Sequence, residues 1–139
     1  MEPRQITEDF SVAPQITPAD IPAIAAAGFR AIMCNRPDGE EPGQPAEAEV
    51  IAAARAAGLE TCSVPFSSAT MTDADVTAFR EALDAMPKPM LAYCRTGTRC
   101  TMMWSIVNHD TLGADTILRA TSAAGYDMSG LVARLQSRQ

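Results

Sequence analysis

The sequence predicts an α/β fold, because a unit of helix, glycine and strand occurs twice and a third strand leads into a cysteine-containing loop. The first unit is an alanine-rich helix over 21–28 followed by an apolar strand over 29–34. The second unit is a helix over 50–58 followed by a strand over 59–64. The glycine after each helix can adopt the left-handed conformation that ends a helix, so the chain turns straight into a strand. Units of this kind pack as the layers of an α/β sheet.

The next helix and strand follow the same order. Thr72 is a suitable N-cap for a helix over 72–86, and apolar residues recur on one face of that segment. Two prolines stop this helix, and a short apolar strand over 90–93 runs directly into Cys94.

The remaining elements lie toward the two ends of the chain. Residues 10–13 are predicted to form an edge strand that Pro14 ends. A helix containing Met103 follows the cysteine-containing loop, and further helices are expected over 114–124 and 129–137.

Two loops, over 35–44 and 65–71, each follow a predicted strand, as Cys94 does. In an open α/β sheet, the loops at the carboxyl ends of the strands form the sites. We therefore expect both loops and Cys94 to meet at one crevice.

Length and composition limit the class of protein. At 139 residues the chain is expected to be a single domain over 1–139. A net charge of −6 argues against a nucleic-acid partner, because phosphate contacts need a basic face. No apolar stretch suits a secretory signal or a membrane span, so we expect a cytoplasmic protein with no membrane partner. Four scattered cysteines and one histidine predict no metal site, and we expect no cofactor.

The loop over 93–100 carries the chemistry. A cysteine at a strand end, then Gly97, then a helix, turns several backbone N–H groups toward one point. Such a nest binds anions and favours thiolate over thiol, so we predict Cys94 to be a nucleophile with a lowered pKa. Arg99 can offer a planar pair of donors to a bound oxyanion. A small anionic substrate is expected here, although the net charge is negative.

The other residues of this loop are predicted to bind the substrate, with one arginine from the loop over 35–44. The predicted substrate-binding residues are Arg95, Thr96, Gly97, Thr98, Cys100 and Arg36. Arg36 is either a second anion contact or a salt-bridge anchor for its own loop. Glu40 and Glu41 are expected to form a solvated loop edge.

The segment from Cys94 to Arg99 resembles the active-site loops of rhodanese-type sulfurtransferases and cysteine-dependent protein phosphatases. A longer series of motifs resembles one bacterial family, the beta-lactamase-hydrolase-like protein phosphatase-like domains, also catalogued as sulfur transferases. The matching segments are 32–40, 64–65, 89–99 and Trp104, in the family's order across about residues 10 to 135. The resemblance implies a fold like that of the dual-specificity phosphatases, with three layers and a mostly parallel central sheet of four to five strands flanked by helices.

Loop length favours the sulfurtransferase interpretation. Four residues separate Cys94 from Arg99, whereas the phosphatase signature has five, and a tighter loop suits a persulfide better than a phosphate on sulfur. Phosphatases usually have a histidine where this chain has Tyr93. A phosphatase also uses a general acid, and the loop over 65–71 contains no carboxylate.

The expected reaction is therefore sulfur transfer. The Cys94 thiolate takes the outer sulfur of thiosulfate or a small persulfide, and the Cys94 persulfide passes it to a thiol acceptor or cyanide. The alternative is a phosphatase acting on a phosphate ester through a Cys94 phosphocysteine, with Asp38 as the general acid or else only a turn former beside Gly39. A second alternative is a non-catalytic oxyanion-binding module.

Cys100 departs from the serine that the resemblance leads us to expect. A thiol donates a weaker hydrogen bond than a hydroxyl, so activation of Cys94 would be less complete. Cys100 could instead form a disulfide with an oxidised Cys94, or simply pack in the first turn of its helix.

Overall fold

The central sheet has five strands in the order β1-β2-β5-β3-β4. A computed structural model of the chain describes residues 2–137. The strands are β1 (Arg4–Gln5), β2 (Phe10–Ala13), β3 (Ala31–Cys34), β4 (Glu60–Ser63) and β5 (Met90–Tyr93). All neighbouring strands pair in parallel except β1 and β2, which are antiparallel. The predicted α/β fold with a mostly parallel sheet is confirmed.

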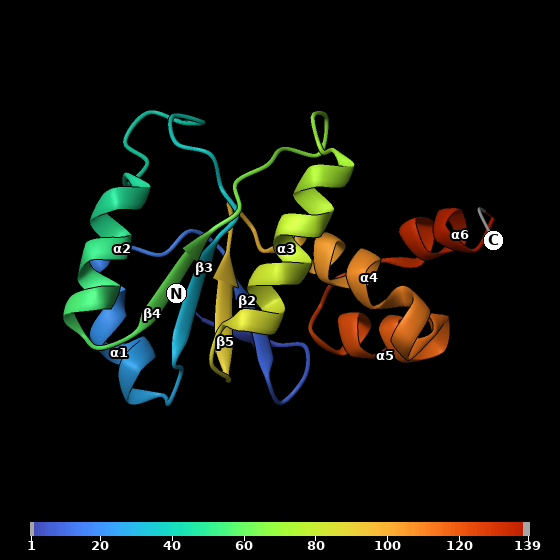
Figure 1. Cartoon of the computed structure of the whole chain (residues 1–139), viewed down its shortest axis with the longest axis horizontal. Helices are drawn as coiled ribbons and strands as arrows, with labels where there is room; N and C mark the ends of the chain where they lie inside the picture. The colour runs from blue at the N-terminus through green and yellow to red at the C-terminus, as the bar shows by residue number, and fades with distance from the viewer. Residues whose placement is uncertain (1, 138–139) are drawn as a thin grey trace.

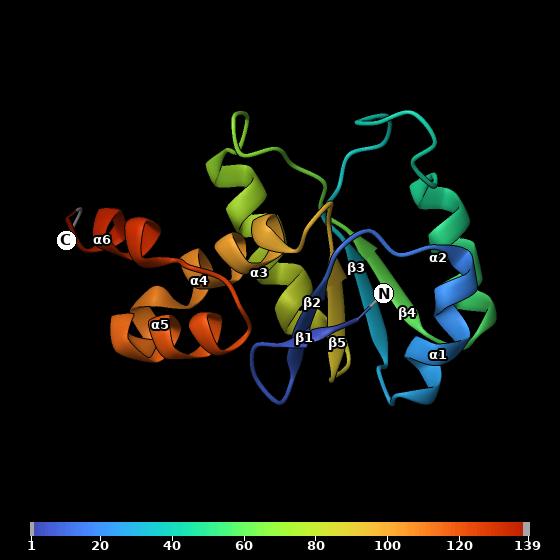
Figure 2. The same cartoon turned by 180° about the vertical axis from the view of Figure 1, so that it is seen from behind.

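Helices cover both faces of this sheet. They are the 3-10 helix η1 (Pro18–Asp20), α1 (Ile21–Ala26), α2 (Glu47–Ala56), α3 (Asp73–Ala85), α4 (Thr98–Leu112), α5 (Ala114–Ala123) and α6 (Ser129–Ser137). Helices α1 and α2 lie on one side of the sheet, and α3 to α6 lie on the other (Figures 1 and 2).

The two faces of the sheet carry separate apolar cores because successive side chains of a strand point to opposite sides. Leu91 and Ile32 pack under α1 and α2. Met33, from the same strand as Ile32, packs into the larger core on the other face. That core contains Phe10 stacked on Trp104, with ring centroids 6.3 Å apart.

Residues 10–13 do not form the edge strand that the sequence predicts. The four residues of β2 are buried, and β2 pairs with β1 on one side and β5 on the other. A tight turn returns the chain from β1, closed by a hydrogen bond from the Ile6 N–H to the Phe10 carbonyl at 2.9 Å. The two-residue β1 therefore covers an edge that would otherwise be exposed.

The loops after β3, β4 and β5 emerge at the same end of the sheet, the top of Figure 1. Parallel strands place their carboxyl ends together, so residues 35–46, residues 64–72 and Cys94 are neighbours despite their separation in sequence. Helix α4 starts at this end as well, directly after the cysteine-containing loop. The predicted convergence of the two loops and Cys94 is thus reproduced.

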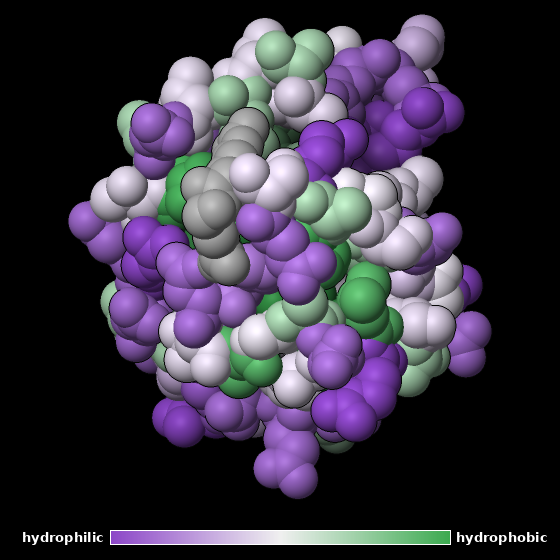
Figure 3. Space-filling view, turned by 90° about the vertical axis from the view of Figure 1, so that its right-hand side faces the viewer, coloured by the Kyte–Doolittle hydropathy of each residue, from purple (hydrophilic) through white to green (hydrophobic). Residues whose placement is uncertain are grey.

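The face formed by α5 and α6 is mostly hydrophilic with separate small apolar patches (Figure 3). Among residues 2–137, no helix has both the length and the apolar character needed to cross a membrane. The same residues contain no cluster of three or more side chains that could bind a metal ion.

Candidate active site around Cys94

Cys94 lies at the end of the central strand β5 and is completely buried. Its N–H donates to the carbonyl of Ala13 on the neighbouring strand at 3.3 Å, which ties the start of the loop to the sheet. Three residues later Gly97 has φ +89° and ψ −11° and is the N-cap of α4. Only a residue without a Cβ takes this left-handed conformation at little cost, so Gly97 permits the turn from the strand into the helix.

This turn surrounds the Cys94 sulfur with donors. The N–H of Gly97 donates to the sulfur at 3.1 Å. The pKa of Cys94 is lowered to about 5. The largest cause is the Cys100 thiol, and the N–H groups of Cys100, Thr96 and Gly97 add to it. Together they outweigh burial, which alone would raise the pKa. Burial and the neighbouring Cys94 raise the pKa of Cys100 well above its ordinary value, so Cys100 stays protonated while Cys94 carries the negative charge.

The threonines of the loop bond to the loop itself. The Thr96 hydroxyl donates to that of Thr98 at 3.0 Å and also accepts from the Thr98 N–H at 3.4 Å. The Thr101 hydroxyl donates to the Gly97 carbonyl at 2.8 Å. These contacts hold the backbone in the shape that exposes its N–H groups to the sulfur.

Arg99 leaves the first turn of α4 and reaches the loops after β3 and β4. Its Nη1 donates to Glu40 Oε2 at 2.8 Å and to the Phe66 carbonyl at 3.1 Å, and its Nη2 donates to Glu40 Oε1 at 2.7 Å. A guanidinium carries five N–H donors in a planar fork. Among the hydrogen bonds of residues 2–137, none uses Nε of Arg99.

Arg36 is an anchor of its own loop, one of the two roles that the sequence allows. Its side chain is only 4% exposed and donates to Glu40 at 2.8 Å, to Glu41 at 2.6 Å and to Gln15 at 3.0 Å. Arg95 is 63% exposed and pairs with Glu41 at 2.9 Å. Three arginines and two glutamates thus form one network of ion pairs beside the Cys94 loop. Its members are Arg36, Arg95, Arg99, Glu40 and Glu41.

Glu40 is the residue of this network that sequence reasoning missed. It was expected at a solvated edge, whereas it bridges Arg36 and Arg99. The Arg99 guanidinium, helped by Arg36, lowers the pKa of Glu40 to about 2, so its carboxylate stays ionised. The spacing of four residues from Arg36 was a possible signal, but nothing local pointed to Arg99, which lies 59 positions away.

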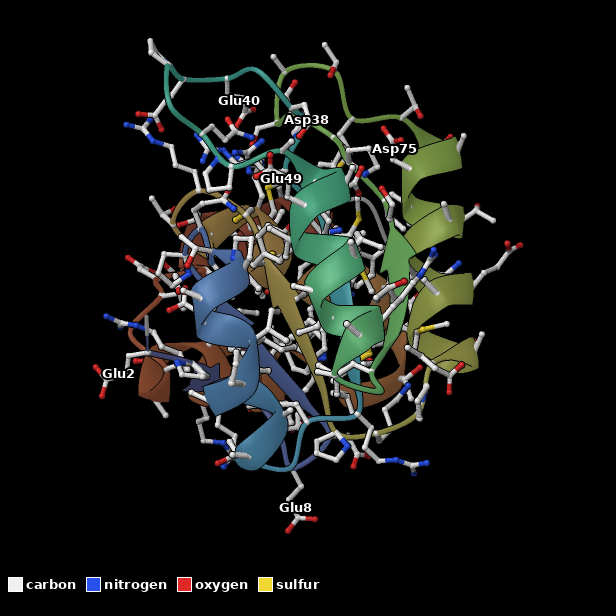
Figure 4. All side chains as sticks on the ribbon, turned by 90° about the vertical axis from the view of Figure 1, so that its left-hand side faces the viewer. Glu2, Glu8, Asp38, Glu40, Glu49 and Asp75 are labelled. Carbon is white, nitrogen blue, oxygen red and sulfur yellow. The ribbon has the colours of Figure 1, made fainter. Side chains whose placement is uncertain are left out.

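Asp38, the predicted general acid, is not brought onto the Cys94 loop. Its carboxylate accepts a hydrogen bond from the Glu47 N–H at 2.8 Å and so supports the first turn of α2. Figure 4 shows Asp38 and Glu40 on the same loop, with Glu40 among the nitrogen-bearing side chains of the site and Asp38 over the start of α2.

Comparison with known proteins gives a consistent result. The family model described as "Beta-lactamase hydrolase-like protein, phosphatase-like domain" matches residues 2–111. A beta-lactamase hydrolase-like protein of Agrobacterium fabrum is 39% identical over 104 residues, which are 75% of this chain and 24% of that protein. The chain spans 24% to 31% of the length of the curated relatives it matches.

Solved structures share the fold. A crystal structure from Neisseria meningitidis Z2491, described as a "putative phosphatase", has a TM-score of 0.85 and 34% identity, and covers 98% of this chain and 97% of its own. The catalytic domain of the PP-IP phosphatase SIW14 from S. cerevisiae, in complex with citrate, has a TM-score of 0.64 at 14% identity and covers 98% of this chain and 91% of its own. At that identity the second likeness shows the fold alone.

The sulfurtransferase prediction is wrong. The matching family is a phosphatase-like domain, and the structure at 34% identity is described as a "putative phosphatase". The predictions of thiosulfate as the sulfur donor and of a thiol as the acceptor depended on sulfur transfer, so they are withdrawn as well. That prediction rested on the four-residue spacing from Cys94 to Arg99, on Tyr93 where phosphatases usually have a histidine, and on a loop over 65–71 without a carboxylate. In the structure the four-residue spacing still places the Gly97 N–H 3.1 Å from the Cys94 sulfur.

Proposed function

The chain belongs to the family of the beta-lactamase hydrolase-like protein, phosphatase-like domain, and from that premise we propose that it is a cysteine-dependent phosphatase acting on phosphate esters. One observation carries the proposal: the Cys94 sulfur accepts hydrogen bonds from the loop that starts at Cys94 and from the first turn of α4. The same N–H groups are suited to an anion beside that sulfur.

In the first step the Cys94 thiolate attacks phosphorus. An S–P bond forms as the bond from phosphorus to the ester oxygen breaks, and a phosphocysteine results. The loop N–H groups and the Nε–Nη2 edge of Arg99 hold the non-bridging oxygens, which carry the negative charge of the transferring phosphoryl group in the transition state. Cys94 has no exposed area, so the side chains above it move aside when the ester enters.

In the second step water attacks the phosphocysteine and releases phosphate, which regenerates the thiolate. An alkyl ester oxygen needs a proton as it departs in the first step, because a free alkoxide is a poor leaving group, whereas an electron-poor aryl oxide such as para-nitrophenolate can leave unprotonated. Glu40 cannot supply it because its low pKa keeps it ionised. Asp38 stays a predicted acid, but its hydrogen bond to the Glu47 N–H ties it to α2. We therefore expect aryl esters, whose leaving oxygens need no donor, to react faster than alkyl esters.

Hydrolysis of para-nitrophenyl phosphate by the purified chain tests this function. Cys94→Ser should abolish turnover, because a serine hydroxyl stays protonated where the thiol ionises. Cys62→Ser is the matched control, since Cys62 lies half-buried in β4 and makes no contact with the Cys94 loop among the described interactions. Acid quenching of the wild type during turnover should trap one phosphoryl group on Cys94.

Two results would contradict the proposal. One is phosphate release by Cys94→Ser at the rate of the wild type. The other is saturable binding of inorganic phosphate without turnover of any aryl ester, which would favour a non-catalytic binding module.

A further inference from the structure

Tyr126 contacts the Cys94 loop from a distant part of the chain. It lies in the linker between α5 and α6, beyond the residues that the family model matches. Its hydroxyl donates to the Thr96 carbonyl at 3.0 Å, across 30 positions of sequence. Burial raises the pKa of Tyr126, so the hydroxyl keeps the proton that it donates.

The bond acts on one particular peptide group. The carbonyl of Thr96 and the N–H of Gly97 belong to the same planar, trans unit, so they point in opposite directions. The carbonyl end is held by Tyr126 at 3.0 Å, and the N–H end donates to the Cys94 sulfur at 3.1 Å. Rotation of this peptide would break both hydrogen bonds together.

The tyrosine packs tightly against the loop. A Cβ added at Gly97 would collide with the Tyr126 hydroxyl. Gly97 is thus required for two reasons, its left-handed conformation and the closeness of this ring.

Tyr126 is itself held from the N-terminal strand. The Arg4 guanidinium lies over its ring, 5.6 Å from the centroid, and Arg4 Nη1 donates to the Ala124 carbonyl at 3.0 Å. A cation over an aromatic face is attracted by the ring's charge distribution. The Tyr126 N–H also donates to the Thr121 carbonyl at 2.9 Å, so both the ring and the backbone of Tyr126 are restrained.

We propose that Tyr126 is a positioning residue: it locks the peptide between Thr96 and Gly97 so that the Gly97 N–H faces the Cys94 sulfur and the anion bound beside it. Tyr126 takes no part in bond making or breaking. Its role in turnover rests on the proposed phosphatase function, whereas its effect on the sulfur does not.

Tyr126→Phe removes only the hydroxyl and keeps the ring under Arg4. The rate of Cys94 alkylation by iodoacetamide, measured against pH with the modified cysteine identified by mass spectrometry, reports the pKa of the thiol. We expect its midpoint to rise by roughly half to one pH unit, because one of several donors to the sulfur is lost. The kcat/KM for para-nitrophenyl phosphate should fall roughly 3- to 10-fold. The acid limb of the pH profile of kcat/KM should move to higher pH, as the alkylation midpoint does.

Ser129→Ala is the matched control. It also removes one hydroxyl from the start of α6, and that hydroxyl bonds to Asp127 at 2.6 Å rather than to the Cys94 loop. Its alkylation profile should equal that of the wild type. An unchanged midpoint in Tyr126→Phe, or an equal shift in Ser129→Ala, would overturn the proposal. A wild type without phosphatase turnover would refute the proposed function while the alkylation shift remained measurable.

Discussion

At the scale of single residues, a second thiol contributes to the low pKa of Cys94. The hydrogen bond from Cys100 is the largest cause of the low Cys94 pKa. Cys100 is fully buried, and its own pKa is raised well above the ordinary value, so it stays protonated and available as a donor. A thiol at this position therefore supports ionisation of Cys94, although a thiol is a weaker donor than the expected serine hydroxyl.

Substitution of Cys100 tests this dependence. In Cys100→Ala the midpoint of Cys94 alkylation should rise above that of the wild type, because the largest cause of the low Cys94 pKa is gone. Cys100→Ser keeps a donor and should retain the low midpoint. A midpoint in Cys100→Ala equal to that of the wild type would show that the backbone N–H groups suffice.

At the scale of elements, a local capping signal defines the start of helix α3, which follows one of the loops at the site. Helix α3 begins with a capping box in which Thr72 accepts from the Asp75 N–H at 3.3 Å and Asp75 accepts from the Thr72 N–H at 2.9 Å. The prediction of a helix over 72–86 with Thr72 as N-cap is confirmed within one residue, because this signal lies entirely within four consecutive residues.

Thr72→Ala should lower the free energy of unfolding by about 1 kcal/mol, the usual cost of losing a threonine N-cap. Urea denaturation measures the change. Thr77→Ala, in the exposed middle of the same helix, is the control and should be neutral or slightly stabilising, since alanine has the higher helix propensity. Equal losses in the two variants would argue against the cap.

At the scale of the whole molecule, the sheet brings together loops that the sequence keeps far apart. Glu40, after β3, forms a two-point ion pair with Arg99 of α4, and Arg99 also donates to the Phe66 carbonyl after β4. The carboxyl ends of three strands are thus joined through one guanidinium. Arg36 also forms an ion pair with Glu40, so the Glu40 carboxylate is held between two guanidinium groups. The ion pair between Glu40 and Arg99 in turn fixes the position of the Arg99 side chain.

This link makes stability depend on pH. Glu40 has a pKa of about 2 in the folded chain, below its ordinary value of 4.5. Its contribution is therefore fully present above pH 4.5 and is lost as the pH falls toward 2, where the folded carboxylate takes up its proton. Urea denaturation across this range should show wild type more stable than Glu40→Gln at pH 7 and the gap closing by pH 2. A gap that stays constant with pH would contradict the role given to the Glu40 charge.

The loop of the candidate site was predictable because its parts are contiguous. Cys94, Gly97 and Arg99 lie within six residues, and the strand before them and the helix after them follow from short apolar patterns. The reaction class was not predictable from that loop. A spacing of four residues between Cys94 and Arg99 occurs in this chain together with a phosphatase-like fold, so the spacing alone does not separate the two reactions. Likeness over nearly the whole chain to phosphatase-like proteins corrected it.

The sequence by itself determined the α/β class and most of the helices and strands, and it singled out Cys94 as the candidate nucleophile, because local propensity, capping and hydrophobic periodicity act over short stretches. Only the tertiary structure decided that Glu40 pairs with Arg99, that Arg36 is buried as an anchor and that Tyr126 holds the peptide of Thr96. Those contacts join residues up to 59 positions apart, and they exist because parallel strands and the returning C-terminal helices carry separate segments to one end of the sheet.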